Sequence, residues 1–198
     1  MAVSIEDIRK LKELTGVGLT DAKTALVEAD GDFDKALEEM RKKGLTKAEK
    51  KADREALEGV IDSYVHGGRI GVLVEVNCET DFVARTDGFK DFAHQIALQV
   101  ASMSPVYVSE ADIPAEEVER VRKEALESDA LKGKPAEMAD KIVDGIVKKH
   151  FADKVLLSQS YIMDDSKTVA DFLKETIAKT GENVVIRRFK RIELGVND

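Results

Sequence analysis

Residues Val60–Asn77 spell VIDSYVHGGRIGVLVEVN, and this stretch decides the fold. Apolar and polar residues alternate on both sides of Gly67-Gly68, which is the pattern of two half-buried strands joined by a tight turn. Paired glycines suit such a turn because both positions need positive φ angles. We therefore expect an antiparallel hairpin over Val60–His66 and Arg69–Asn77. Three valines of the second strand share one face and are expected to be buried: Val72, Val74 and Val76.

Downstream of the hairpin the apolar spacing changes to the helical period, and the chain closes with another strand. Thr180-Gly181 is expected to end the last helix, because glycine accepts the left-handed conformation that follows a helix. Helices are expected over Phe89–Met103, Pro114–Ser128, Pro135–His150 and Thr168–Lys179, a short extended segment over Val155–Ile162, and a strand over Val184–Leu194. This order predicts an α+β core domain with an antiparallel sheet packed by helices.

Residues 4–44 carry the apolar spacing of three short helices. Ser4 followed by Asp7 resembles a capping box, and Thr20 and Asp32 are expected to cap the second and third helices. Such a small bundle has little core, so we interpret it as a docking module. The residues expected to face inward are Ile5, Ile8, Leu11 and Leu14, then Ala22, Ala25, Leu26 and Ala29, then Phe33, Ala36, Leu37 and Met40.

Charged residues dominate the next segment, from Lys47 to Glu58. This run is either a basic contact patch or a solvated helical linker, and mixed charge is more typical of the linker. The chain is thus expected to divide into a helical module at residues 1–45, a charged linker at 46–58 and the α+β core domain at 59–198.

The composition indicates a globular protein, with 43% hydrophobic and 35% charged residues among 198. The net charge of −8 argues against a general affinity for nucleic acid or anionic membranes. One cysteine and no signal peptide at the start predict a cytoplasmic protein. The longest stretch without charge, Phe92–Ser109, contains glutamines, serines and a proline, so it predicts a buried helix followed by a loop rather than a membrane span.

Catalytic chemistry finds little support in the sequence. Cys78 could pair with a histidine as a thiol nucleophile, but it continues the alternation of the buried valines, which favours a small core residue. The histidines available to it are His66, His94 and His150. Neither a metal-ligand spacing nor a phosphate-binding glycine loop is recognisable, so we expect no metal, no cofactor and no enzymatic activity.

A basic cluster in the last strand, Arg187–Arg191, surrounds the aromatic Phe189. Such a cluster resembles a platform for stacking nucleic-acid bases. Strand alternation instead sends these charges to opposite faces in an acidic protein, which favours pairing within the chain and no direct nucleic-acid binding.

The hairpin runs directly into Asn77–Arg85, NCETDFVAR, where an acid and an aromatic stand side by side. Asp81 and Phe82 fit a helix N-cap followed by a core residue. They fit equally a protruding wedge, because aromatic side chains are common anchors at protein interfaces. The residues alone leave both interpretations open.

The segment Asn77–Arg85 resembles the signature of the elongation factor Ts family, in which N-C-x-T-D-F-V-A precedes a basic residue. Leu14–Lys23, LTGVGLTDAK, is similar to the family's other signature, which lies in an N-terminal module of ubiquitin-associated-like fold. The closing Gly181–Phe189, GENVVIRRF, is also typical of the family. The resemblance thus covers the beginning, middle and end of the chain.

The resemblance implies a guanine-nucleotide exchange factor that binds the GDP-bound elongation factor Tu and promotes GDP release. It implies that Thr80, Asp81, Phe82 and Val83 dislodge the partner's Mg²⁺, and that Lys12, Leu19 and Lys23 in the N-terminal module also bind the partner. Short members are expected to pair as homodimers that engage two partner molecules, and to lack the coiled-coil hairpin of longer members. The rival hypotheses are a binding module without exchange activity and the small thiol enzyme.

Overall fold

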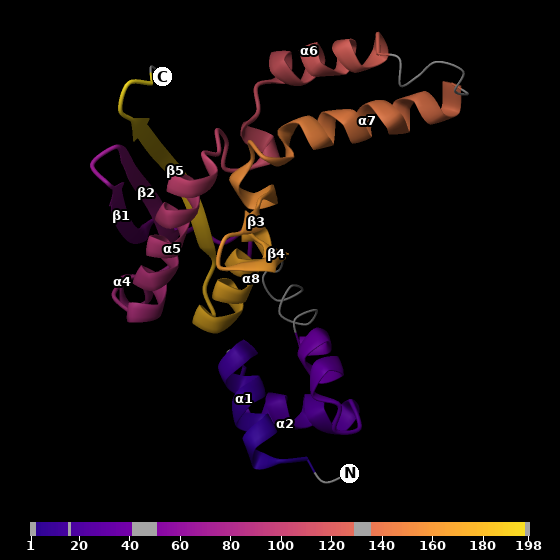
Figure 1. The fold of residues 1–198 in the computed structure, drawn as a ribbon. Helices are drawn as coiled ribbons and strands as arrows, with labels where there is room; N and C mark the ends of the chain where they lie inside the picture. Colours follow the sequence, from indigo (N-terminus) through magenta and orange to yellow (C-terminus); the bar gives the residue numbers. More distant parts are fainter. Residues whose placement is uncertain (1–2, 16, 41–50, 129–135, 197–198) are drawn as a thin grey trace.

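The computed structural model describes residues 3–15, 17–40, 51–128 and 136–196. It has the predicted α+β architecture, in which N-terminal helices precede an antiparallel sheet covered by helices (Figure 1). Within these ranges, every helix is too short or too polar to cross a lipid bilayer.

The predicted hairpin is confirmed as β1 (Glu58–His66) and β2 (Ile70–Cys78). Gly67 and Gly68 have φ angles of 55° and 67°, a left-handed conformation that a side chain would disfavour. The N–H of Arg69 donates a 2.9 Å hydrogen bond to the His66 carbonyl and closes the turn. The two glycines therefore fix the register of the hairpin.

The last strand, β5 (Val184–Glu193), pairs antiparallel with β2 and gives the sheet order β1-β2-β5. The register shifts between Glu75 and Val76, where Arg187 forms a bulge. Beyond the bulge, Cys78 pairs with Val184 as the last rung of the ladder. The N-terminal end of β5 thus lies beside the C-terminal end of β2, where the signature segment begins.

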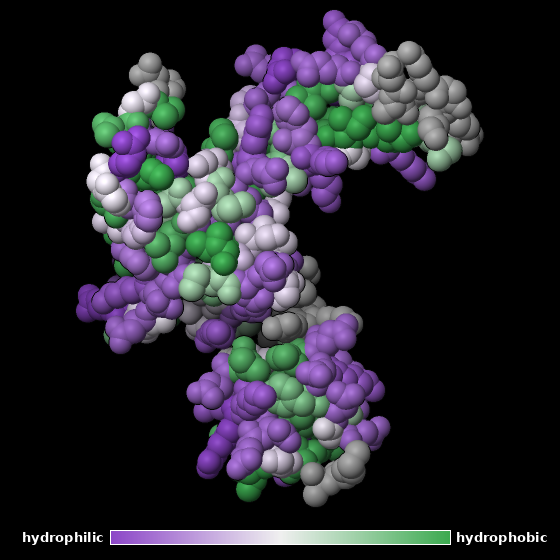
Figure 2. Space-filling view, in the orientation of Figure 1, coloured by the Kyte–Doolittle hydropathy of each residue, from purple (hydrophilic) through white to green (hydrophobic). Residues whose placement is uncertain are grey.

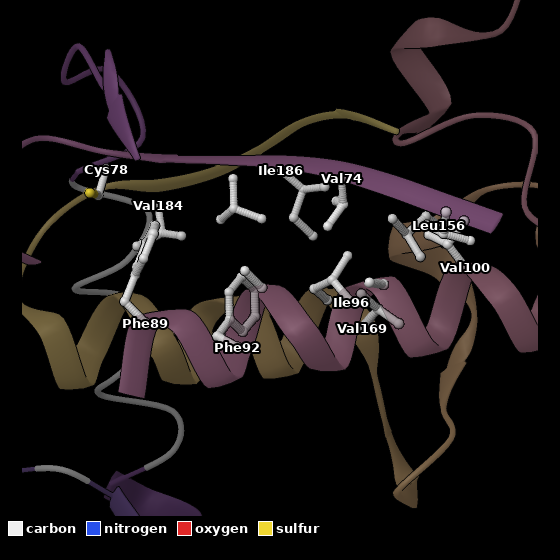
Figure 3. Packing of buried hydrophobic residues seen from close by; sticks show 14 of the residues in the cluster. Val74, Cys78, Phe89, Phe92, Ile96, Val100, Leu156, Val169, Val184 and Ile186 are labelled. Atoms are coloured by element: carbon white, nitrogen blue, oxygen red, sulfur yellow. The ribbon is translucent and has the colours of Figure 1, made fainter. Parts of the chain in front are cut away.

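Helices α5 (Asp87–Met103) and α8 (Val169–Thr180) cover one face of this sheet. Thr86 caps α5 by accepting a hydrogen bond from the Phe89 N–H, and Gly181 ends α8 with a φ angle of 75°. Figure 3 shows side chains of the two helices meeting those of the strands in one buried layer. The predicted inward residues of β2 are in this layer: Val72, Val74, Val76 and Cys78.

The N-terminal unit contains α1 (Ile5–Thr15), α2 (Leu19–Glu28) and a helix over residues 33–40 around its own small core. Asp32 accepts a hydrogen bond from the Lys35 N–H, as expected of a cap. The expected cap at Thr20 is wrong, because α2 begins at Leu19 and Gly18 takes the cap position, two residues before Thr20. Ile5 and Leu14 are exposed, so the buried stripe of α1 is shorter than expected. Gly16, between α1 and α2, and Gly44, at the end of the segment predicted to form three helices, lie outside the described residues.

The expectation of a helical linker is wrong for residues 51–57, which form turns and irregular structure, although most of their side chains are exposed as expected of a solvated segment. Asn183 donates hydrogen bonds to the carbonyls of Ala52 and Arg54. Arg187 donates to the carbonyl of Ala56. This docking replaces water as the partner of the backbone, so the segment belongs structurally to the core domain. The rest of the charged run, up to Lys50, lies outside the described residues.

Helices α6 (Ala115–Leu126) and α7 (Ala136–Ala152) project from the sheet domain as a pair (Figures 1 and 2). Arg122 on α6 and Asp144 on α7 are joined by a 2.7 Å ion pair. The two helices therefore pack against each other, in a chain for which the family resemblance predicted no coiled-coil hairpin. After α7, the predicted extended segment is also partly wrong: residues Leu156–Ser158 form a 3-10 turn, followed by the short strands β3 (Ser160–Tyr161) and β4 (Asp164–Thr168).

Candidate functional site

The signature segment forms a single helical turn, α4 (Asp81–Ala84), at the end of β2. Thr80 is its N-cap, and the Thr80 hydroxyl oxygen accepts a 3.4 Å hydrogen bond from the Val83 N–H. Asp81 is therefore the first helical residue, where a carboxylate interacts favourably with the positive end of the helix. The N-cap interpretation of Asp81 is wrong by one residue.

The side chains of α4 divide between solvent and core. Phe82 is 78% exposed, whereas Ala84 is buried and Val83 packs partly buried against the main core. The interpretation of Phe82 as a core residue is therefore wrong. An aromatic ring this exposed at the end of a rigid sheet is available to a partner protein.

Asp81 is paired with Arg85 through a 2.8 Å contact between its Oδ2 and an arginine Nη2. Both side chains are substantially exposed, at 43% for Asp81 and 77% for Arg85, so solvent screens the attraction. The Asp81 carboxylate can therefore exchange this arginine for a partner's group at little cost.

Cys78 lies fully buried at the end of the core beside Val184 (Figure 3). Burial raises the pKa of its thiol to about 11, and the nearby Glu182 carboxylate adds to the effect. The thiol donates a hydrogen bond to the Thr80 carbonyl at a sulfur–oxygen distance of 3.2 Å. A buried, protonated thiol is a poor nucleophile, so the core interpretation of Cys78 is confirmed.

The candidate base partners of that thiol are engaged elsewhere. His66 lies 2.9 Å from the Tyr64 hydroxyl and His94 lies 2.9 Å from Asp62. His150 on α7 lies 3.2 Å from the Lys154 ammonium, which follows the end of that helix. In the described part of the chain, no group of histidine, cysteine and acidic side chains is arranged to hold a metal ion.

The three arginines of the basic cluster of β5 are bonded within the chain, as the alternation predicted. Arg188 forms a 2.6 Å ion pair with Glu75, and Arg191 forms one of 2.7 Å with Glu193. Arg187 donates to the side chain of Asn77, and Phe189 packs against the core. The aromatic ring of the cluster is therefore partly covered by the core.

The N-terminal candidates Lys12, Leu19 and Lys23 are all exposed on the helical unit, Lys12 on α1 and the other two on α2. Leu19 is 52% exposed although it is apolar. Leu19 and Lys23 are four residues apart, so they share one face of α2. These residues and α4 lie on separate units of the chain, each with its own core.

Sequence reasoning missed the residues that hold the base of α4. The Glu182 carboxylate accepts hydrogen bonds from the backbone N–H groups of Glu79 and Thr80, although it is 102 residues from Thr80 in sequence. Asn183 in turn donates its backbone N–H to Glu79. The only sequence signal was that both segments are typical of one family.

A family model described as Elongation factor TS matches residues 6–177. Among curated proteins, elongation factor Ts of Thermoanaerobacter sp. (strain X514) is 53% identical over 195 residues, which cover 98% of this chain and 95% of the relative. Elongation factor Ts of Thermotoga maritima is 53% identical over 196 residues, covering 98% of each chain. Elongation factor Ts of Coprothermobacter proteolyticus is 50% identical over 196 residues, covering 98% of this chain and all of the relative.

Proposed function

Because this chain belongs to the elongation factor Ts family and thus acts in translation elongation, we propose that it is the guanine-nucleotide exchange factor for elongation factor Tu. In this proposal it binds the GDP-bound partner in the cytoplasm, promotes GDP release, and leaves when GTP rebinds. It makes and breaks no covalent bond.

The exposed Phe82 is the observation that carries this proposal. A large apolar side chain that is 78% exposed gains stability only when a partner covers it. Its neighbours Thr80, Asp81 and Val83 complete the tip that we propose enters the partner's nucleotide-binding domain. The tip needs only to displace a packed element there, because Mg²⁺ bridges the nucleotide phosphates and protein ligands.

Coupling between the two binding events follows from thermodynamics. The factor by which this protein weakens GDP binding equals the factor by which GDP weakens the binding of this protein. The exchange factor therefore accelerates the exchange of nucleotide. Which nucleotide ends up bound is determined by the relative concentrations of GTP and GDP.

The N-terminal helical unit supplies a second contact in this proposal. Exposed Leu19 provides an apolar anchor, and Lys12 and Lys23 provide positive charge for an acidic surface of the partner. We retain the expectation that this unit has a ubiquitin-associated-like fold. Two contacts on separate units raise the affinity of the whole chain above that of either unit.

The decisive experiment measures release of a fluorescent GDP analogue from elongation factor Tu on addition of this protein. The wild-type chain is expected to accelerate release, and Phe82→Ala to lose most of the acceleration. Met163→Ala is a matched control, because Met163 is also an exposed apolar residue, at 65%, but lies on the β3–β4 turn. Unchanged release at saturating wild-type protein would refute the exchange function, and undiminished acceleration by Phe82→Ala would refute the role of the tip.

The same experiment separates exchange from simple binding. A binding module without exchange activity would form the complex while GDP release stayed at its spontaneous rate. Binding is measured independently by sedimentation of the mixture.

We further propose that two copies pair as a homodimer that engages two partner molecules. The sheet face opposite α5 and α8 exposes apolar side chains, namely Ile61 at 70%, Val65 at 66%, Leu73 at 54% and Ile192 at 67%. An apolar sheet face of this kind gains stability when a second sheet covers it. Light scattering is expected to give the dimer mass for the wild-type chain and the monomer mass for Leu73→Lys; a wild-type monomer at every concentration would refute pairing.

A further inference from the structure

Glu182 lies in the loop between α8 and β5, directly beneath the tip. Its carboxylate accepts hydrogen bonds from the Glu79 N–H at 3.1 Å, the Thr80 N–H at 3.0 Å and the Thr80 hydroxyl at 2.7 Å. Hydrogen bonds to a charged acceptor are stronger than those between neutral groups. One side chain therefore satisfies every hydrogen-bond donor of Thr80.

A reciprocal contact completes this arrangement. The Glu79 carboxylate accepts a 2.6 Å hydrogen bond from the Asn183 N–H and lies 3.4 Å from Arg54. Backbone pairing of β2 with β5 ends at Cys78 and Val184, so these side chains continue the connection past the last backbone rung. We call Glu79, Glu182 and Asn183 the clasp.

The clasp determines the orientation of the cap of α4. The Thr80 hydroxyl donates its proton to Glu182, so its oxygen lone pair remains available to accept the Val83 N–H. A helix of one turn is not stable by itself, because the conformational entropy lost in nucleation exceeds the stabilisation from the hydrogen bonds of a single turn. The orientation of Phe82 therefore depends on contacts at the base of the turn.

The clasp also receives the segment that leads from the N-terminal unit. Asn183 holds the carbonyls of Ala52 and Arg54, and the Lys51 ammonium donates to the Gly181 carbonyl. Residues 51–54, which follow the N-terminal unit in the sequence, are thus anchored on the loop that holds the tip.

We propose that Glu182 is a positioning residue for nucleotide exchange, which fixes the cap of α4 so that Phe82 and Asp81 meet the partner in one orientation. This rests on the proposed function of the tip. A positioning role predicts a change in the maximal exchange rate, because other surfaces still bind the partner while a misaligned tip acts on it less effectively.

The test compares Glu182→Ala, Glu182→Gln and Glu124→Ala in the full chain. Glutamine keeps an oxygen that can accept both N–H groups and an amide that can donate to the Thr80 oxygen. Glu124→Ala removes a carboxylate that pairs with Arg120 along α6. Release of fluorescent GDP from elongation factor Tu is measured over a range of protein concentrations, and hydrogen exchange is measured at the amides of Glu79 and Thr80.

Glu182→Ala is expected to lower the maximal release rate by about 10- to 100-fold, with a half-saturating concentration within about threefold of wild type. The amides of Glu79 and Thr80 should exchange faster in this variant. Glu182→Gln should restore most of the rate and the amide protection, and Glu124→Ala should match wild type. A structural role alone would lower the amount of folded protein and leave the rate per folded molecule unchanged.

The outcomes separate this inference from the proposed function. If Glu182→Ala releases GDP at the wild-type rate while Phe82→Ala does not, the positioning role is overturned and the proposed role of the tip stands. Undiminished exchange by Phe82→Ala overturns the role of the tip and the positioning role with it. If Glu182→Ala does not fold, Glu182→Asp is the deciding variant: its shorter carboxylate should reduce the maximal rate without loss of binding, and a wild-type rate overturns the inference.

Discussion

Phe82 and Phe89 lie on consecutive helices, yet Phe82 is 78% exposed and Phe89 is fully buried in the core. The cap at Thr86 separates them, because it ends the turn of α4 and starts α5 against the sheet. The same residue type therefore serves opposite purposes within one short segment. The ring of Phe82 faces solvent, and the ring of Phe89 anchors α5 in the core.

Replacing each of these two phenylalanines by alanine should have very different effects on stability. Phe89→Ala is expected to lower the free energy of unfolding by about 3–5 kcal/mol, because it leaves a cavity in the main core. Phe82→Ala should change it by less than about 0.5 kcal/mol, because solvent already surrounds the ring. Urea unfolding followed by circular dichroism measures both values. Comparable losses in the two variants would contradict the difference in burial.

Asn183→Ala is expected to release residues 51–56 from the core domain. Asn183 is buried, and its amide group donates to the carbonyls of Ala52 and Arg54 at 3.3 and 2.7 Å. Losing both bonds should cost about 1–3 kcal/mol of stability, since the carbonyls must find new partners.

Limited trypsin digestion under native conditions checks this release. Cleavage after Lys51 and Arg54 should be faster in Asn183→Ala than in wild type, and mass spectrometry of the fragments identifies the sites. Equal cleavage rates at both residues would show that the amide does not hold the segment.

Local periodicity was sufficient to predict the hairpin and most helices. The alternation of Val72, Val74 and Val76 depends only on which face of one strand is covered, so it is visible in the sequence. Cys78 was placed correctly by the same pattern. The paired glycines at 67 and 68 identified the turn for an equally local reason.

Features that depend on distant segments could not be predicted in this way. The clasp joins Glu79 to Asn183 across 104 residues, and no local pattern marks either as a partner of the other. The charged segment before β1 was predicted to be a linker because its side chains are polar. Its position is instead fixed by its backbone carbonyls, which accept hydrogen bonds from Asn183 and Arg187. Helices α6 and α7 were each predicted, but not their pairing, which brings Val121 of α6 and Phe151 of α7 into one buried cluster.

The exposure of Phe82 was similarly undetermined by sequence. An aromatic residue after a helix start fits a core position or a contact surface equally well. The structure decides the exposure, because Val83 and Ala84 take the inward positions of the short turn.

The stability of the protein should fall at alkaline pH through Cys78. Burial raises the pKa of this thiol from 9.0 to about 11, so the folded state holds the proton more tightly than the unfolded state. The resulting stabilisation is complete below pH 9 and is lost as the pH rises from about 9 to about 11. Unfolding curves of wild type and Cys78→Ala, measured across this range, isolate the contribution because all other titrating groups are shared. Parallel profiles would contradict it.

Two glycines should respond to alanine with opposite signs. Gly59 has a φ angle of +151°, and an added Cβ would lie 2.1 Å from the Val76 carbonyl oxygen and 2.8 Å from the Asn77 Cα on the paired strand. Because these are backbone atoms of β2, the strands must separate, and Gly59→Ala should destabilise the protein by more than about 2 kcal/mol. Gly145 is exposed on α7 with open space around the Cβ position. Gly145→Ala should therefore stabilise the protein by about 0.5–1 kcal/mol, because alanine loses less conformational entropy in a helix. Thermal unfolding of the two variants measures both effects, and a stabilising Gly59→Ala would contradict the close approach of β1 to β2.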